Sequence, residues 1–208
     1  MHDQAKLIQA AALVEAVQDK EAAHRQIEEA VRRILFAVGE DPDREGLQKT
    51  PERVARMYDE LLEGYSIEPM AMINNACFDA QYNEMVVVKD IDFFSLCEHH
   101  MLPFFGRVDI AYIPKDKVLG LSKIPRVVEM FSRRLQLQER MTQEIASFLD
   151  ELLHPEGVAV LVTGQHLCSM MRGVRKVNAR MVTQAMVGKF EEKESREQFL
   201  ERIRDYER

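Results

Sequence analysis

The stretch FFSLCEHHMLPF, residues 93–104, places a thiol, a carboxylate and two imidazoles between apolar side chains. Cys97 and His100 are three residues apart, and ligands at this spacing can converge on one ion from a turn. A thiolate and an imidazole are donors that zinc prefers. Because a buried polar group costs free energy unless it is paired, hydrogen-bonded or bound, this stretch predicts a partner for its thiol and imidazole.

A second segment, GQHLCSMMRG at 164–173, again places a histidine and a cysteine two residues apart, at His166 and Cys168. The chain has six histidines and three cysteines, and three of those histidines and two of those cysteines fall in these two segments. An isolated C-x-x-H pair is more often a buried cysteine near a core histidine. Two such segments, each beside a predicted strand, favour a shared metal site.

The predicted ion would have three protein ligands: Cys97, His100 and Cys168. Three ligands and a water are typical of catalytic zinc, whereas four closed ligands mark a structural site. Cys77 is the remaining cysteine that could close the site, and its surroundings, NNACFDAQ, favour a small buried side chain instead. His99 and His166 remain as imidazoles beside the metal, where they can move protons. This set predicts hydrolytic chemistry with metal-acidified water.

Basic residues form two local islands in a chain whose net charge is −7. The islands are Arg172, Arg175, Lys176 and Arg180, and Lys123, Arg126, Arg133 and Arg134. Arginine suits phosphate oxygens, although any single such residue is more often a solvated surface or a subunit contact. Neither G-x-x-x-x-G-K-[ST] nor G-x-G-x-x-G occurs, so side chains or helix N-termini must hold the phosphate. The islands favour a small phosphorylated substrate.

Two predicted helix starts offer further polar groups to a substrate. Ser122 and Lys123 precede one helix, and Gln138 and Glu139 open the next. Glu139 could accept two N–H bonds from the edge of a purine or pterin. A glutamate in a first helical turn also complements the helix dipole, so the residue types alone leave its role open.

The elements that must position these groups change character near residue 75. Hydrophobic spacing predicts helices at about 4–38, at 50 onwards with Gly64 able to end it, and at 124–135, 139–154 and 195–208. It predicts strands at about 85–88, 107–113, 157–164 and 178–188. Because strands do not alternate singly with helices, we expect an α+β fold with an antiparallel sheet.

Composition bears on the class of protein and its surroundings. The acidic net charge argues against a nucleic-acid binder, and no apolar run approaches the ~18 residues of a membrane span. The N-terminal residues do not read as a signal peptide. Three cysteines beside 12 methionines indicate a reducing cytosol rather than a disulfide framework. We therefore expect a cytoplasmic protein that binds neither nucleic acid nor membrane.

Taken in order, these segments resemble the GTP cyclohydrolase I family. The resemblance spans about residues 22–190 and includes EGLQKTPERVARMYDELLEGY, FFSLCEHHMLPFFG, AYIPKDKVLGLSKIPRVVEMFSRRLQLQERMTQEIA and GQHLCSMMRGVRK. It implies a T-fold, an antiparallel sheet with two helices on one face, over residues 75–208, after an N-terminal helical region at 1–74. It also implies a homodecamer with active sites between subunits. About the first 20 residues lie outside the resemblance.

The resemblance further implies roles for individual residues. The family's zinc ligands fall on Cys97, His100 and Cys168. Its catalytic histidines fall on His99 and His166. Its substrate-pocket positions fall on Ser122, Lys123, Gln138, Glu139 and Arg172, with Glu139 reading the guanine. Arg126 falls on a position associated with the triphosphate. Ser169 departs from the family, in which methionine is common after the last ligand.

The implied reaction converts GTP and water into 7,8-dihydroneopterin triphosphate and formate, the first step of pterin and tetrahydrofolate biosynthesis. Zinc-bound hydroxide attacks purine C8, the imidazole ring opens, formate leaves, and an Amadori-type rearrangement precedes ring closure. Lys123, Arg126 and Arg172 would hold the triphosphate.

Two rival interpretations stand beside this one. Other T-fold enzymes reduce nitriles with a catalytic cysteine or hold zinc with three histidines, and the Cys–His–Cys set fits neither. The other rival is a non-catalytic protein with a closed structural zinc, in which Cys77 would be the fourth ligand.

Overall fold

The computed structural model describes residues 20–79 and 81–204, which divide into two compact units between residues 60 and 61. Within these described residues, no helix has the length and apolar character that a membrane crossing requires. The predicted boundary between residues 74 and 75 stays a prediction. The second unit carries the predicted site residues.

The first unit contains two helices, α2 (Lys20–Ala37) and α3 (Thr50–Leu61). The helix predicted at about 4–38 is present from Lys20, and its residues 4–19 lie outside the described part of the chain. Asp59 joins the two helices, since its Oδ2 lies 2.9 Å from His24 Nε2 and 3.0 Å from Lys20 Nζ. The unit is thus a helix pair held partly by polar contacts.

Gly64 does not end α3 as predicted, because that helix already ends at Leu61. Gly64 lies in the short helix η1 (Glu63–Tyr65) and is buried. A Cβ added there would lie 2.5 Å from Met130 O and 2.8 Å from Arg133 O. This glycine is therefore needed for close backbone approach rather than for a helix cap.

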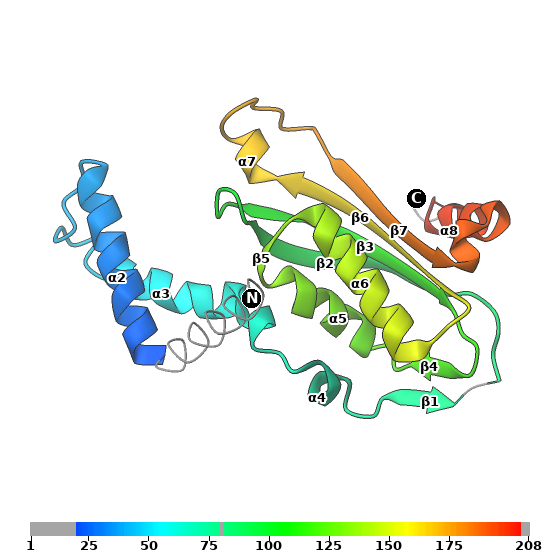
Figure 1. The fold of residues 1–208 in the computed structure, drawn as a ribbon. Helices are drawn as coiled ribbons and strands as arrows, with labels where there is room; N and C mark the ends of the chain where they lie inside the picture. Colours follow the sequence, from blue (N-terminus) through cyan, green and yellow to red (C-terminus); the bar gives the residue numbers. More distant parts are fainter. Residues whose placement is uncertain (1–19, 80, 205–208) are drawn as a thin grey trace, which may run out of the picture. The chain divides into compact units, whose positions relative to one another are not determined.

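The second unit is built on a five-stranded sheet of order β5-β2-β3-β6-β7 (Figure 1). Its strands are β2 (Val86–Cys97), β3 (Pro103–Ile113), β5 (Leu135–Gln136), β6 (Gly157–His166) and β7 (Met181–Gly188). Every neighbouring pair is antiparallel except the two-residue pairing of β5 with β2. A separate two-stranded sheet pairs β1 (Cys77–Asp79) with β4 (Lys117–Leu119).

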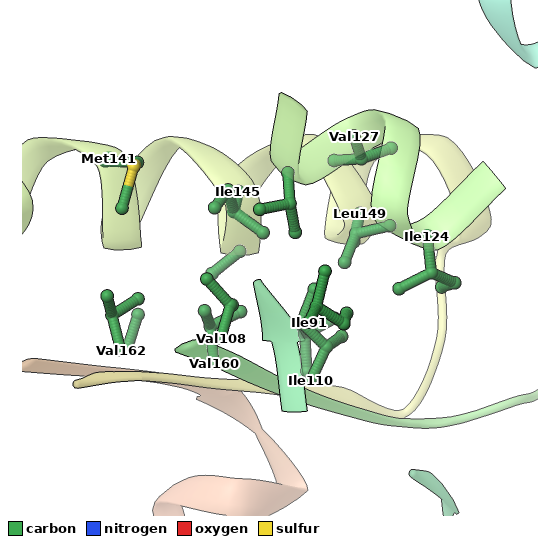
Figure 2. Packing of buried hydrophobic residues seen from close by; sticks show 14 of the residues in the cluster. Ile91, Val108, Ile110, Ile124, Val127, Met141, Ile145, Leu149, Val160 and Val162 are labelled. Atoms are coloured by element: carbon green, nitrogen blue, oxygen red, sulfur yellow. The ribbon is translucent and has the colours of Figure 1, made fainter. Parts of the chain in front are cut away.

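Two helices, α5 (Lys123–Ser132) and α6 (Gln138–Leu153), cover one face of the five-stranded sheet. Figure 2 shows their apolar side chains facing those of β2, β3 and β6, with Ile145 and Leu149 of α6 above Val108 and Ile110 of β3. Period-two alternation along β3 supplies this layer, because every second residue from Val108 to Tyr112 is buried. The second unit is therefore an α+β T-fold, as expected.

Shorter elements complete the second unit. They are α4 (Pro69–Ile73), α7 (Leu167–Met170), η2 (Lys189–Glu191) and α8 (Lys193–Arg204). The other face of the sheet carries a smaller core, in which Phe190 and Phe199 pack with Ala111 and Ala159. Helix α8 thus covers part of the face opposite α5 and α6.

The two ends of the five-stranded sheet carry different groups of residues. We name the "cluster end" after the place where β2 finishes at Cys97 and β6 at His166. We name the "Tyr112 end" after the opposite place, where the Tyr112 hydroxyl accepts the Leu119 N–H at 3.2 Å. Phe104 and Tyr112 are eight residues apart on β3, so the ends are about 26 Å apart at ~3.3 Å per residue.

Candidate metal centre and substrate site

The structure brings Cys97, His100 and Cys168 together at the cluster end, with their potential ligand atoms all within 4.8 Å of one another. Cys97 is the last residue of β2, and α7 carries Cys168 directly after β6. Strand β3 lies between β2 and β6 and pairs with both. Antiparallel pairing therefore delivers the two motif segments to the same place, as their positions beside predicted strands suggested.

A tight turn holds His100 against Cys97. The Met101 N–H donates to Cys97 O at 2.8 Å, and the Cys97 N–H donates to Leu102 O at 2.9 Å. Met101 has a φ of 53°, the left-handed conformation that closes this turn. As a result Cys97 Sγ and His100 Nδ1 lie 4.0 Å apart, and His99 is exposed beside them with its ring centroid 6.2 Å from that of His100.

The donor set fits a bound cation. Burial raises the pKa of the Cys168 thiol, and nearby Cys97 raises it further. Two close thiols disfavour each other's ionisation, whereas a shared cation stabilises both thiolates. Two atoms bound to one zinc ion at ~2.3 Å are at most about 4.6 Å apart, so this cluster is close to the compactness that shared ligation requires.

Cys77 does not join this cluster within one chain. It lies in β1, where it pairs with Leu119 of β4, and is half-buried and free. Leu119 contacts the Tyr112 hydroxyl, so Cys77 belongs to the Tyr112 end. The cluster therefore has three potential ligands from the described part of its own chain.

His166 is held by contacts on two sides. The Phe104 ring stacks on its ring with centroids 4.7 Å apart and planes 3° apart. Its Nε2 lies 2.9 Å from Oε1 of Gln138, the first residue of α6. Burial lowers the pKa of His166, while Glu139 acts in the opposite direction. The fold thus favours a neutral imidazole in a fixed orientation next to the three potential metal ligands.

The first turn of α6 contacts both motif segments. Gln138 reaches His166, and the Arg140 guanidinium forms an ion pair with Glu98, which lies between Cys97 and His99. Between them Glu139 is exposed, so its carboxylate is available to a ligand. Neither the Glu98–Arg140 pair nor the Phe104 stack was found by sequence reasoning. The opposite charges of Glu98 and Arg140 were a sequence signal that could have indicated the ion pair. No local sequence pattern indicated that Phe104 stacks on His166.

Arg172 also lies at the cluster. Its Nη1 donates to Cys168 O at 3.2 Å and lies 3.2 Å from His100 Nε2. The other members of its basic island follow in an exposed loop, at residues 171–180. The cluster end thus combines a potential metal site, two imidazoles, an exposed carboxylate and an arginine.

Ser122, Lys123 and Arg126 do not join the cluster within one chain. Lys123 Nζ donates to Met72 O at 2.7 Å, and its N–H donates to Gly120 O at 2.8 Å. These contacts place the start of α5 beside α4 and β4 at the Tyr112 end (Figure 1). Two members of the same predicted island have structural partners, because Arg134 donates to Gly64 O at 2.9 Å and Arg133 lies 3.9 Å from Glu63.

A cavity of about 520 Å³ lies elsewhere, on the sheet face that α8 partly covers. Its lining includes Asp90, Asp92, Arg107, Asp109 and Arg180. None of the predicted ligands, catalytic histidines or substrate-pocket residues lines it. The cavity therefore does not contain the proposed reaction centre, although Arg180 of the predicted basic island lines it.

Comparison with known proteins gives a consistent set of relatives. A family model described as GTP cyclohydrolase I matches residues 27–204. GTP cyclohydrolase 1 of Chlorobium phaeovibrioides is 55% identical over 177 residues, covering 85% of this chain and 79% of that protein. The Gloeobacter violaceus protein of the same name is 53% identical over 176 residues, covering 84% and 82%. That of Porphyromonas gingivalis is 49% identical over 185 residues, covering 89% and 96%.

Proposed function

The chain belongs to the GTP cyclohydrolase I family, and we propose that it converts GTP and water into 7,8-dihydroneopterin triphosphate and formate. This is a hydrolysis of cyclic amidine C–N bonds and the first step of pterin and tetrahydrofolate biosynthesis. The observation that carries the proposal is the Cys97–His100–Cys168 cluster at the sheet end where His166 is also fixed. The chain would act in the cytoplasm.

We propose that the metal is zinc, held by Cys97, His100 and Cys168. Two thiolates and an imidazole are soft and borderline donors, which suit zinc better than magnesium or calcium. When bound, such an ion supplies Lewis acidity and lowers the pKa of a coordinated water. The absence of a fourth side chain from the same cluster, among the described residues, supports an open rather than a structural site.

The chain's own groups have distinct tasks in this proposal. His99 and His166 carry protons as the purine imidazole ring opens, formate leaves and the ribose rearranges. Glu139, exposed in the first turn of α6, accepts N–H bonds from the guanine edge. Arg172 binds phosphate oxygens, since its guanidinium already lies beside the cluster. The Glu98–Arg140 ion pair holds the metal-binding turn against α6.

We further propose that each active site combines the cluster end of one chain with the Tyr112 end of another. Ser122, Lys123 and Arg126 would then hold the triphosphate of a GTP whose base lies at a neighbouring chain's cluster. The separation of about 26 Å between the ends of one sheet supports this, because a single GTP cannot reach both. A homodecamer with shared sites satisfies the requirement, with residues 75–208 as the catalytic domain after a helical region at 1–74.

The reaction is tested by incubating the purified protein with GTP. We expect release of formate and, after oxidation, the fluorescence of a pterin, and we expect a chelator to abolish both. Release of inorganic phosphate without formate would instead indicate a phosphatase, and turnover that survives complete metal removal would exclude the proposed role of the ion.

Site sharing is tested by complementation between two variants that are each impaired at a different end. Cys168→Ala disables the cluster end, and Lys123→Ala weakens the Tyr112 end. When the two chains are unfolded, mixed equally and reassembled, about one quarter of shared sites would combine two intact halves. Activity well above that of either variant alone is expected. If the mixture is no more active than its components, each site is built within one chain.

A further inference from the structure

The side chain of Gln138 is buried and its orientation is determined by neighbours from two strands. It is 1% exposed, although it is the first residue of α6. Its amide nitrogen lies 3.1 Å from each of three oxygen atoms: Val162 O, Met181 O and Thr183 Oγ1. The first two are carbonyl oxygens and can only accept a hydrogen bond.

The third oxygen must accept as well. The Thr142 hydroxyl donates to Gln138 O at 2.7 Å, so its proton is already used. Thr142 and Thr183 hydroxyl oxygens are 2.7 Å apart, and therefore Thr183 must be the donor between them. With its own proton used in this way, Thr183 can only accept from Gln138. A reversed amide would place its oxygen against three acceptors, which excludes that orientation.

This orientation directs the amide oxygen of Gln138 at His166. Oε1 lies 2.9 Å from His166 Nε2, and a carbonyl oxygen can only accept, so Nε2 carries the proton. In a neutral imidazole the other nitrogen, Nδ1, is then unprotonated. A Cβ at Gly164 would lie 2.2 Å from Oε1, so the absence of a side chain there makes room for the amide.

We propose that Gln138 is a positioning residue that fixes His166 as the Nε2–H tautomer, and that it does not contact GTP. His166 Nδ1 is then the nitrogen that accepts a proton during turnover. The assignment differs from the substrate-binding role that family resemblance implies for Gln138. It rests on the proposed function for the task of His166, whereas the tautomer itself does not depend on which reaction the protein catalyses.

The tautomer can be measured directly by solid-state ¹⁵N NMR on the metal-loaded protein with labelled histidine, using His166→Ala to assign the signals. We expect wild-type His166 to show a protonated Nε2 and an unprotonated Nδ1. In Gln138→Met the hydrogen bond is lost while the side-chain length is kept, and a mixture of tautomers is expected. A wild-type Nδ1–H form would overturn the proposal without any variant, even if Gln138→Met failed to fold.

Gln136→Met is the matched control. Gln136 is also buried, at 2% exposed, and its amide nitrogen donates to Phe131 O and Glu144 rather than to His166. Gln136 is the last residue of β5, and its Oε1 also accepts from Arg140 Nε at 3.1 Å, so the same substitution there removes a comparable set of hydrogen bonds beside the turn into α6. We expect the His166 tautomer to remain as in the wild type, and an equal change in both variants would mean a general disturbance of the turn.

Kinetics separates positioning from substrate contact. In Gln138→Met we expect kcat to fall by about a hundredfold, the scale of one general acid–base interaction, with unchanged metal content and a nearly unchanged dissociation constant for GTP. Weaker GTP binding with an unaltered tautomer would instead make Gln138 a substrate contact. If wild-type protein released no formate, the proposed function would fail while the tautomer result would still stand.

Discussion

The two ends of the sheet differ in the chemical groups that one chain places there. At the cluster end, β2, α6 and α7 bring three potential metal ligands together with His166, Glu139 and Arg172. At the Tyr112 end, Ser122, Lys123 and Arg126 lie near a free cysteine, and among the described residues no group of possible metal ligands gathers there. Under the proposal of shared sites, one chain would carry the reaction centre of one site and phosphate-binding residues of another.

The largest effect is expected from removing a ligand at the cluster end. Cys168→Ala should lose bound metal and reduce turnover by more than about a hundredfold, since even partners of metal ligands contribute 10–100-fold. Lys123→Ala, at the Tyr112 end, should keep its metal and weaken GTP binding instead. Elemental analysis and steady-state kinetics check both. A Cys168→Ala protein that still binds its full complement of metal would show that Cys168 is not a ligand.

The backbone is packed more tightly at the cluster end than at the Tyr112 end, as the space around one glycine at each end shows. A Cβ at Gly106 of β3 would lie 1.9 Å from Thr163 O, whereas a Cβ at Gly120 would find its nearest neighbour, Ala76 Cβ, at 3.5 Å. Gly106→Ala should therefore lower the free energy of unfolding by about 2–3 kcal/mol, and Gly120→Ala should change it by less than about 0.5 kcal/mol. Urea denaturation of the two variants measures both changes in the free energy of unfolding. Equal losses would mean that the backbone at the cluster end can move to accommodate the added methyl group.

The fold could be predicted from the sequence wherever one buried face repeats at a regular period. Ile145 and Leu149 recur along α6, which was predicted within one residue of each bound. Val108 and Ile110 alternate along β3, which was predicted from 107 to its end although the strand begins at Pro103. Strand β2 was predicted only at 85–88 because Asp90, with a φ of 54°, interrupts its pairing between Val88 and Ile91. A bulge of this kind breaks the period that the prediction reads.

The residue types and spacing predicted which side chains could bind a metal. They did not predict that the candidate site residues lie at two opposite ends of the sheet. Cys97 and His100 are neighbours in sequence, so their approach follows from a single turn. The burial of Gln138 depends on oxygens of β6 and β7, which are 24 to 45 residues away in the chain. Likewise, Lys123 is the first residue of α5, a helix whose direction along the sheet sets the distance of Lys123 from the cluster, and no local pattern encodes that direction.

A smaller effect is expected from the Tyr112 hydroxyl, which accepts the buried Leu119 N–H. Tyr112→Phe leaves that donor without its partner and should cost about 1–2 kcal/mol. Burial raises the pKa of Tyr112, nearby Cys77 adds to this, and the hydrogen bond from Leu119 opposes it. Above the unfolded pKa of ~10, the unfolded chain therefore loses its phenolic proton first, and wild-type stability falls as pH rises.

The phenylalanine variant lacks this titration, so its deficit in unfolding free energy should shrink between about pH 10 and the higher pKa of the folded state. Urea denaturation of both proteins from pH 8 upward measures the difference. A deficit that stays constant or grows with pH would show that the hydroxyl is not held protonated by the fold. In either case metal content should be unchanged, because Tyr112 is not one of the potential metal ligands.

The smallest effect is expected from Cys77→Ser, and it is the sharpest test of an open metal site. Within one chain Cys77 pairs with Leu119 at the Tyr112 end, too far away to reach the cluster. If sites are shared, however, that same end of a neighbouring chain approaches the cluster, and the neighbour's Cys77 is the thiol that could close the coordination. Half-buried Cys77 should tolerate the change, with metal content and turnover within about twofold of wild type. Metal loss in the assembled Cys77→Ser enzyme would show a fourth thiolate ligand from a partner chain, and the site would then be structural rather than open to water.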